Sequence, residues 1–368
     1  MPKIAIIHDH LNQNGGAEKV LEALQEIYSD SPIYTLVFDQ RKTNIKTSDQ
    51  QIRTSFIQKI PLGVKKFEWF LIFMPAATEH YDLSEFDIII SSASAFSKGI
   101  ITRPETLHIC YCHTPTRYLW TDSHNYIKEL HHGPIVKRTL PLVLTKLRQW
   151  DRLAAERVNL FVANSNEVKK RIKKYYRRDS IVIFPPVDTH RFRISQNIGD
   201  YFLTGGRLVP YKRFDLAIHT FNRLGFKLKI FGTGPMFKDL KKIAGPTIDF
   251  VGNISDHDKI TLFENCRAFI HPQVEDFGIT AVEAMAAGRP VIAFNKGGAL
   301  DTIIDGETGT LFHEQNWETL ADTLIRFDHN KFNPALIKKH AEQFDKTVFR
   351  ANIEHLVAKT WTKFQSSL

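Results

Sequence analysis

Two glutamates, Glu275 and Glu283, stand eight positions apart around a predicted junction between a loop and a helix. Gly278 lies at the expected start of this alanine-rich helix, which runs to Gly288, a residue type common just after a helix end. A helix N-terminus carries about half a positive charge and presents backbone N–H groups, so it can bind an anion. Two carboxylates placed here could contact both ends of one elongated ligand, such as its sugar and ribose hydroxyls. The alternative is that Glu283 faces solvent and Glu275 only complements the helix dipole.

A second loop carries two cations that suit a diphosphate. Arg207 and Lys212 follow the predicted strand Tyr201–Thr204. An arginine guanidinium is a planar fork that matches phosphate oxygens, and a lysine ammonium is a compact charge. Because the loops that follow parallel strands gather at one edge of a sheet, both cations are predicted to lie near the helix that starts at Gly278. A solvated basic turn is the alternative.

Two loops in the first half of the chain also have residue types that suit a ligand. Gly15 and Gly16 separate the predicted strand Ile4–His8 from a helix. Paired glycines at such a point let a phosphate approach the backbone, although tight turns without a ligand use them about as often. His113 follows the predicted strand Leu107–Tyr111, where it could hydrogen-bond a substrate or be a structural histidine.

The loop after the predicted strand Leu228–Phe231 contains Gly232 and Gly234. This is only a G-x-G pattern, without the third glycine and the downstream acidic residue of dinucleotide-binding loops. A dinucleotide-dependent oxidoreductase is therefore disfavoured.

Short apolar runs alternate with helical patterns along the chain, which is typical of parallel sheets covered on both faces. Pro185 and Pro186 interrupt the alternation, which then restarts. The sequence therefore predicts an α/β fold with two Rossmann-like, doubly wound parallel-sheet domains, 1–187 and 188–347, that face each other across a cleft. The segment 348–368 is predicted to be helical and to pack back on one of them, with the first domain preferred. The predicted strands are Ile4–His8, Asp87–Ser91, Leu107–Tyr111, Leu160–Asn164, Tyr201–Thr204, Leu228–Phe231, Ile248–Val251, Ala268–His271 and Val291–Phe294.

Length and composition narrow the function classes. The 368 residues, 43% apolar and 24% charged, are typical of a globular protein with about two domains. Three cysteines without a C-x-x-C pair argue against a zinc site or a secreted disulfide framework, and they fit a cytoplasmic location. No apolar run is long enough to span a membrane, and the N-terminus does not have the layout of a signal peptide. The net charge of +9 favours an anionic partner. A nucleic-acid-binding protein ranks low, because the densest charge is confined to one predicted helix and no binding motif accompanies it.

Together these motifs resemble the retaining glycosyltransferases of family 4, which have the two-domain GT-B architecture. Within that family, several segments look closest to bacterial O-antigen and polysaccharide mannosyltransferases. Asp301 stands where the family more often has glutamate, a minor change that leaves the reaction class unaltered. The resemblance covers nearly the whole chain, and its motifs are Gly15-Gly16-Ala17-Glu18, His113-Thr114-Pro115, Gly206-Arg207-Leu208 with Lys212, and the E-x7-E pattern from Glu275 to Glu283.

The resemblance implies a role for each charged residue. Arg207 and Lys212 neutralise the diphosphate as it leaves, so no metal is required. Glu275 and His113 contact the donor sugar, and Glu283 holds the ribose hydroxyls. The sequence shows no obvious covalent nucleophile, so the departing phosphate is expected to take the acceptor's proton on the same face. Further donor contacts are expected from Gly15, Gly16, Gly232, Gly234, Val251, Asn253, Ile254, Phe277, Gly278, Ile279 and Thr280.

The implied donor is a nucleotide sugar, with GDP-mannose preferred, and the implied acceptor is a lipid-linked or polysaccharide glycan, as in lipopolysaccharide synthesis. A UDP donor with glucosyl or galactosyl transfer is the alternative. Two regions bear on the acceptor: Lys169–Arg178 is densely basic, and Lys59–Met74 mixes lysines with aromatic residues. They predict peripheral docking on the anionic inner face of the cytoplasmic membrane. A solvated helix face and a buried core are the alternatives.

Two clusters have the residue types of metal ligands. Asp256-His257-Asp258 matches the D-x-D metal motif of a different glycosyltransferase architecture, but it follows Ser255 at a predicted helix start. Because Ser and Asp cap backbone N–H groups there, capping is predicted rather than metal binding. His8-Asp9-His10 lacks a third partner element and is interpreted as a polar patch at a strand end.

Overall fold

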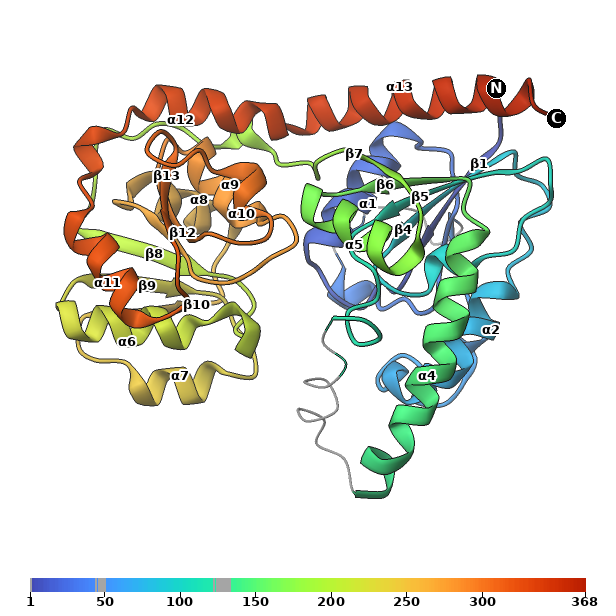
Figure 1. The fold of residues 1–368 in the computed structure, drawn as a ribbon, viewed down its shortest axis with the longest axis horizontal. Helices are drawn as coiled ribbons and strands as arrows, with labels where there is room; N and C mark the ends of the chain where they lie inside the picture. Colours follow the sequence, from blue (N-terminus) through green and yellow to red (C-terminus); the bar gives the residue numbers. More distant parts are fainter. Residues whose placement is uncertain (1, 44, 46–50, 122, 124–133) are drawn as a thin grey trace. The chain divides into compact units, whose positions relative to one another are not determined.

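The computed structural model describes residues 2–368 apart from 44, 46–50, 122 and 124–133. Its chain divides into two compact units: unit 1 is Met1–Phe184 with Phe349–Leu368, and unit 2 is Pro185–Val348. Each unit contains a parallel sheet with helices on both faces, as Figure 1 shows. The predicted α/β class with two doubly wound sheets is therefore confirmed. The cleft between the sheets stays a prediction.

The described part of unit 1 holds a seven-stranded sheet of order β3-β2-β1-β4-β5-β6-β7, with every neighbouring pair parallel. The chain order reverses between β1 and β4, which makes the loops after these two strands a switch point of the kind where ligands bind. All residues of β4 and β5 are buried, as expected for strands covered on both faces. The strands are β1 (Ile4–His8), β2 (Ile33–Thr35), β3 (Ile52–Thr54), β4 (Ile88–Ala93), β5 (Leu107–Cys112), β6 (Leu160–Ala163) and β7 (Ser180–Val182).

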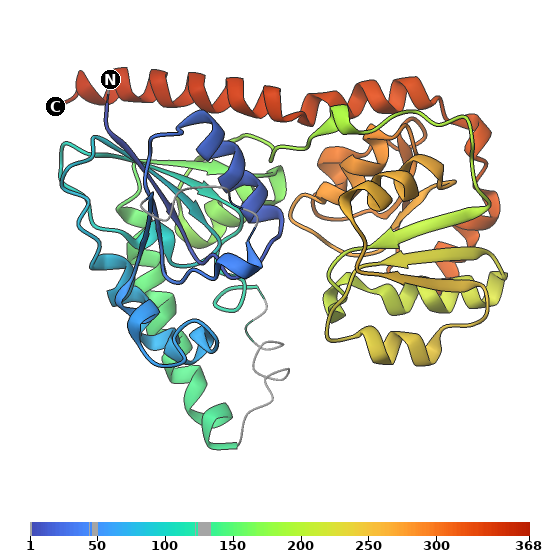
Figure 2. The same cartoon turned by 180° about the vertical axis from the view of Figure 1, so that it is seen from behind.

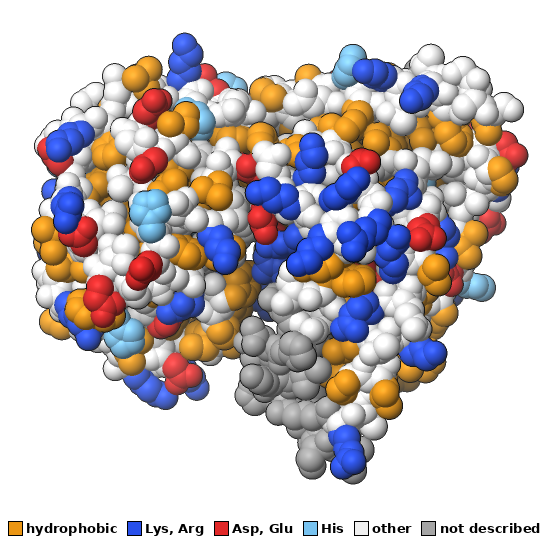
Figure 3. All heavy atoms as spheres, viewed as in Figure 1, with side chains coloured by type: hydrophobic (Ala, Val, Ile, Leu, Met, Phe, Trp, Pro, Cys, Tyr) orange, Lys and Arg blue, Asp and Glu red, His pale blue; other side chains and the backbone are white. Residues whose placement is uncertain are grey.

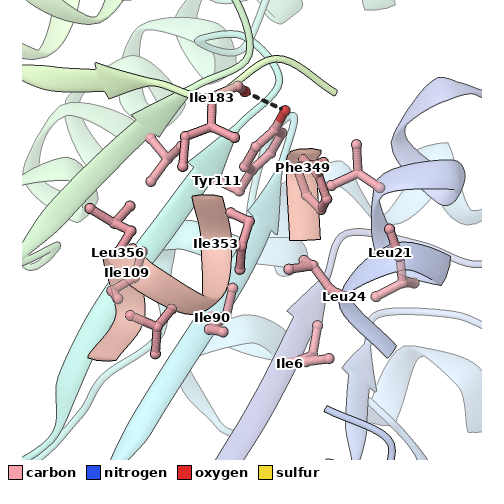
Figure 4. Packing of buried hydrophobic residues seen from close by; sticks show 14 of the residues in the cluster. Ile6, Leu21, Leu24, Ile90, Ile109, Tyr111, Ile183, Phe349, Ile353 and Leu356 are labelled. Atoms are coloured by element: carbon pink, nitrogen blue, oxygen red, sulfur yellow. Dashed lines mark hydrogen bonds between the residues drawn. The ribbon is translucent and has the colours of Figure 1, made fainter. Parts of the chain in front are cut away.

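Helices α1 (Gly16–Ile27) and α13 (Lys346–Gln365) cover one face of this sheet. Figure 4 shows Leu21 and Leu24 of α1 and Phe349 of α13 packed together over the strands. From Phe349 onward, α13 therefore packs on unit 1. Seen from behind in Figure 2, α1 lies in front of the strands. The other helical segments of unit 1 include η3 (Phe56–Lys59), η4 (Phe67–Phe73), α2 (Met74–Glu79), η5 (Ser97–Gly99), α4 (Pro134–Glu156) and α5 (Asn166–Tyr176).

Unit 2 has a parallel sheet of order β10-β9-β8-β11-β12-β13. Here the chain order reverses between β8 and β11, so the loops after these strands form its switch point. The strands are β8 (Tyr201–Gly205), β9 (Lys227–Phe231), β10 (Ile248–Gly252), β11 (Phe269–His271), β12 (Val291–Phe294) and β13 (Gly309–Phe312). The helical segments include η7 (Pro210–Lys212), α6 (Phe214–Leu224), α7 (Phe237–Ile243), α8 (Asp256–Asn265), α9 (Ile279–Ala286), α10 (Ala299–Thr302), α11 (Trp317–Arg326) and α12 (Pro334–Ala341).

Two helix starts in unit 2 bear on the sequence predictions. The Ser255 side chain accepts a hydrogen bond from the Asp258 N–H, so the predicted capping of α8 is confirmed. Gly278 precedes α9 with a φ of +94°, a conformation that residues with a Cβ rarely adopt. No side chain caps this end of α9. Gly288 follows the helix in the left-handed region, as its position in the sequence predicted.

Candidate functional site

An ion pair lies at the switch point of unit 2. Lys212, at the end of the loop after β8, places its Nζ 2.8 Å from Oε1 of Glu275, in the loop after β11. The two side chains are 12% and 17% exposed. Burial raises the pKa of Glu275, but Lys212 and His271 outweigh it and bring the pKa to about 2, so this carboxylate is charged at neutral pH. Arg207 lies exposed on the same loop as Lys212.

Glycines allow the loop after β8 to pass close to the neighbouring backbone. Gly206 has a φ of +130°, and a Cβ on it would lie 3.0 Å from Lys212 Nζ, so the ammonium rests directly against the backbone. A Cβ on Gly232 would lie 1.9 Å from the Gly206 carbonyl oxygen, and one on Gly234 would lie 2.4 Å from that of Leu208. The loops after β8 and β9 therefore cross at these glycines. Contact of Gly232 and Gly234 with a donor stays a prediction.

At the end of β11, in the loop after it and in the first turn of α9, three buried polar atoms have no hydrogen-bond partner among the described residues: His271 Nε2, Gln273 Oε1 and Thr280 Oγ1. Gln273 Nε2 donates to His271 Nδ1 over 3.0 Å, which leaves the His271 proton on Nε2. Burial lowers the pKa of His271 to about 4, so its ring is neutral at pH 7. Buried polar groups without partners are costly and uncommon. They indicate a position where a polar ligand or water completes the hydrogen bonds.

The start of α9 lies beside these atoms. A Cβ on Gly278 would lie 3.2 Å from His271 Nε2. Ile279 and Thr280 form the first turn of α9, and Phe277 is buried against the ring of Phe344. Cationic, N–H and neutral imidazole donors thus surround one carboxylate, which suits an anionic and hydroxyl-rich ligand. Sequence reasoning missed His271, the last residue of β11, and Gln273. For Gln273, its place in the loop just after a buried strand is a usable signal.

Glu283 lies on α9 and is 4% exposed, so the alternative of a solvent-facing side chain is wrong. Lys259 of α8 places its Nζ 2.5 Å from Glu283 Oε2. Sequence reasoning did not predict Lys259. The remaining donor candidates, Val251, Asn253 and Ile254, lie at the end of edge strand β10, which β9 separates from β8. Their contact with a base stays a prediction.

A chain of polar groups lies at the switch point of unit 1. His113, after β5, is 8% exposed and has its Nε2 2.8 Å from Ser92 Oγ. Ser92 Oγ lies 3.1 Å from His8 Nδ1, and His8 Nε2 lies 3.5 Å from Glu18 Oε1. Burial raises the pKa of Glu18, but the contact with His8 outweighs it and brings the pKa to about 2. The sequence did not indicate that these residues meet.

The glycine loop of unit 1 lies over Glu18. Gly15 precedes α1 and Gly16 is its first residue. A Cβ on Gly15 would lie 3.1 Å from Glu18 Oε2, which has no hydrogen-bond partner in the described ranges, as is also true of His10 Nδ1. These atoms are orphaned like those around Glu275. A role of Gly15 and Gly16 in phosphate contact stays a prediction.

Asp9, the middle residue of the His8-Asp9-His10 patch, has a structural role. Its carboxylate accepts hydrogen bonds of 2.6–2.8 Å from the backbone N–H groups of residues 94–97. Burial alone would raise the pKa of Asp9. His8, His10 and these N–H groups together lower it by more, so the net shift is downward. Asp9 therefore orders the loop after β4.

The sequence of the chain matches two family profiles. The profile described as Glycosyltransferase Family 4 matches residues 14–191, and that of Glycosyl transferases group 1 matches residues 186–347. This chain belongs to glycosyltransferase family 4. The match of both halves accounts for two Rossmann-like units in one chain, which is the GT-B fold class.

Individual family 4 relatives are distant. The chain is 27% identical over 281 residues to "Alpha-1,3/1,6-mannosyltransferase ALG2" of Dictyostelium discoideum, covering 63% of this chain and 64% of that protein. It is 29% identical over 206 residues to "O-antigen chain mannosyltransferase C" of Escherichia coli, covering 50% and 52%. The chain thus spans less than two thirds of the length of these two relatives. Among solved structures, Anabaena Alr3699/HepE in complex with UDP and glucose has a TM-score of 0.70 at 19% identity, covering 97% of this chain and 100% of that chain.

Proposed function

We propose that this chain is a retaining mannosyltransferase that transfers mannose from GDP-mannose to a lipid-linked or polysaccharide glycan. The observation that carries the proposal is the Lys212–Glu275 pair beside the uncapped start of α9 and the orphaned Nε2 of His271. The names of the Dictyostelium and E. coli relatives support mannose as the sugar.

The proposed reaction follows the charges. The bond between the sugar carbon and the diphosphate oxygen breaks, and the diphosphate leaves with the electron pair. Lys212, Arg207 and the N–H groups of α9 stabilise the growing negative charge, so the chemistry needs no metal ion. The acceptor hydroxyl attacks the same face of the sugar, and its proton passes to the departing phosphate. Glu275, ionised and held by Lys212, accepts hydrogen bonds from the hydroxyls of the donor sugar.

A UDP-sugar donor is the second candidate, and it is favoured by one observation. The Anabaena protein with the same fold was crystallised with UDP and glucose. At 19% identity this likeness concerns the fold and does not extend to the base. The proposal therefore keeps GDP-mannose first and treats UDP-glucose and UDP-galactose as competitors.

Thermal unfolding in the presence of each nucleotide decides between the donors. We expect GDP and GDP-mannose at saturating concentration to raise Tm by several degrees, since a ligand at 100 times its Kd stabilises by about 2.7 kcal/mol. UDP and UDP-glucose should raise it less. A transfer assay with a pool of polyprenyl-linked glycans, with and without EDTA, then tests the reaction itself. A larger shift with UDP would favour the second donor, and no shift or transfer with any nucleotide sugar would refute the proposed function.

We further propose that unit 1 docks on an anionic membrane that carries the acceptor. No helix in the described ranges is long and apolar enough to cross a bilayer. Trp69 and Phe73 of η4 and Leu142 of α4 are 61%, 53% and 71% exposed, although Phe67 and Phe70 pack against the core. The alternative of a wholly buried segment is therefore wrong for Lys59–Met74. Figure 3 shows lysine and arginine side chains gathered over α5 on one face of unit 1. Beside Trp69, the Lys66 Nζ lies 5.6 Å from the ring centroid. Exposed aromatic residues and positive charge on one unit suit an anionic bilayer.

Sedimentation with vesicles tests this docking. The chain is expected to co-sediment with phosphatidylglycerol vesicles at low salt and to be released at high salt or from phosphatidylcholine. Trp69→Ser with Phe73→Ser should weaken the binding. Leu336→Ser, which removes another exposed apolar side chain (62% exposed, on α12), is the matched control and should not. Equal binding to both lipids by all variants would contradict docking through this segment.

A further inference from the structure

Strand β4 carries two adjacent serines that each bond a histidine. Ser91 Oγ lies 2.8 Å from His108 Nε2, and Ser92 Oγ lies 2.8 Å from His113 Nε2. Both serines are fully buried, and their side chains point to opposite faces of the sheet because they are neighbours in a strand. The two hydrogen bonds therefore match in distance, chemistry and burial.

The two serine–histidine pairs differ in their further hydrogen-bond partners. His108 Nδ1 has no hydrogen-bond partner among the described residues, so the Ser91 pair ends at that ring. Ser92 Oγ lies also 3.1 Å from His8 Nδ1, and His8 continues to the buried carboxylate of Glu18. Within the described part of the chain, it is therefore the Ser92 pair whose hydrogen bonds lead to a carboxylate.

The single hydroxyl proton of Ser92 couples the two imidazoles it bridges. If the hydroxyl donates to one ring nitrogen, the other ring must donate to the serine oxygen, since a neutral imidazole carries one N–H. Glu18 lies beside His8 Nε2 and favours the proton there, which leaves His8 Nδ1 as an acceptor. Ser92 then donates to His8, and His113 Nε2–H donates to Ser92.

The position of the His113 ring is also constrained. Tyr111 packs against it in an edge-on arrangement, with ring centroids 5.3 Å apart. The hydroxyl of Tyr111 donates to the Ile183 carbonyl over 2.9 Å, which Figure 4 shows as a dashed line. Tyr111 therefore fixes where the ring lies, whereas Ser92 determines which of its nitrogens holds the proton.

We propose that Ser92, His8 and Glu18 are positioning residues that hold His113 with its proton on Nε2, and that they thereby set how its ring is presented to the donor sugar. The link to the sugar rests on the proposed function, whereas the link among the four side chains does not. No covalent bond is made or broken in this relay, by which we mean the chain of hydrogen bonds from Glu18 through His8 and Ser92 to His113. It sets the direction of hydrogen bonds before the substrate binds, so it acts on the rate of transfer through His113.

Nitrogen-15 NMR of the histidine rings tests the relay directly, because the shifts of Nδ1 and Nε2 report which one is protonated. The His113 signals are assigned by their loss in His113→Gln. We expect a predominant Nε2–H form in the unaltered chain and a mixture of both forms in Ser92→Ala. Ser91→Ala is the matched control, since it removes an equally short and equally buried bond to a histidine. It should alter His108 and leave the His113 signals as they are.

Kinetics supply the second readout. Ser92→Ala should lower kcat by about ten-fold, the effect of one lost hydrogen bond, with little change in KM. Ser91→Ala should leave kcat unchanged although it lowers stability by a similar amount. If Ser92→Ala does not fold, Glu18→Gln keeps the shape, removes the charge and should still shift His113 toward the mixture.

The proposal is overturned if the His113 nitrogen shifts in Ser92→Ala and Glu18→Gln equal those of the unaltered chain. It is also overturned if Ser91→Ala lowers kcat as much as Ser92→Ala does. Its failure is distinguishable from failure of the proposed function. A chain that transfers no sugar still reports the tautomer of His113 by NMR, and a failed relay leaves transfer by the unaltered chain intact.

Discussion

Each unit holds a lysine–carboxylate pair, and the two pairs have opposite surroundings. In unit 1, Lys98 of η5 lies 2.5 Å from Asp151 of α4, and the side chains are 2% and 1% exposed. Asp151 also accepts hydrogen bonds from Thr116 Oγ1 and Trp120 Nε1, so protein donors reach both of its oxygens. In unit 2, the Lys212–Glu275 pair is 12% and 17% exposed and lies among orphaned polar atoms.

The difference separates a structural ion pair from the one that we propose to face a ligand. Lys98 and Asp151 join η5, the loop after β5 and α4. Burial lowers the pKa of Lys98, but Asp151 and the nearby cysteines together raise it, so the net shift is upward. An orphan is present here too, since the hydroxyl of Tyr176 beside Lys98 lacks a partner within the described part of the chain. The Lys212 and Glu275 side chains, however, are partly exposed, and two such atoms, His271 Nε2 and Gln273 Oε1, belong to side chains beside Glu275. Exposure combined with missing partners, rather than the ion pair itself, marks the site.

The largest expected effect concerns the structural pair. Lys98→Met leaves the Asp151 charge buried without its cation, so the free energy of unfolding should fall by about 3–5 kcal/mol. Chemical denaturation measures this change. Lys242→Met, which removes a lysine from the exposed Lys242–Asp239 pair, is the control and should leave stability nearly unchanged. Equal stabilities of the two variants would show that Lys98 is not structural.

The next effect concerns the site pair. Lys212→Ala should lower kcat by about a hundred-fold or more, because a cation in its proposed role, next to the leaving diphosphate, acts mainly in the transition state. Glu275→Ala should be as inactive, and neither should lower Tm much. Lys227→Ala, in an exposed pair with Asp200, is the matched control and should keep full activity. If either site variant retains most of its activity, the assignment of the site fails.

The smallest effect concerns the neutral histidine beside Glu275. The pKa of His271 is lowered to about 4, and that of His108 in unit 1 to about 3, by burial. Below pH 6.5 the unfolded chain binds these protons and the folded chain does not. The contribution of the two neutral histidines to the free energy of unfolding is therefore complete above pH 6.5. As the pH falls toward 4, the free energy of unfolding decreases by about 1.4 kcal/mol per pH unit for each histidine.

Unfolding curves between pH 7 and pH 4 measure this slope. His271→Gln and His108→Gln should each reduce it by one histidine's share. A slope that stays the same in His271→Gln would mean that His271 is already protonated in the folded chain. It would then be a charged group at the site rather than a neutral donor.

Much of the fold could be predicted because its strands are buried on both faces. Runs such as Leu107–Tyr111 and Val291–Phe294 are apolar enough to stand out from the helical patterns around them. Strands β2, β3, β7 and β13 were missed, since each has only three or four residues and little periodicity can appear in so short a run. The long helix α4 was missed too. Its mixed polar pattern and internal Pro141 obscure a helix that tertiary packing supports.

The candidate site, like the fold, could be predicted from the sequence only in part. Residues that stand just after predicted strands, such as Arg207, Glu275 and His113, could be proposed as candidates because parallel strands bring such loops to one edge of their sheet. The side chains that hold them were not found. Ser92 and His271 lie in strands, where a polar residue has no local signal of its partner.

The order of residues was enough to indicate the class of sheet, the loops that carry chemistry and the charge they present, because these depend on local periodicity and on glycine and proline. The pairing of Lys212 with Glu275, of Glu283 with Lys259 and of His113 with Ser92 emerged only in three dimensions. Each pair joins positions at least 21 residues apart in the chain, and their distances depend on how strands align and how helices pack on the sheet. Burial and missing hydrogen-bond partners, which separate a binding group from a structural one, are likewise properties of the packed chain alone.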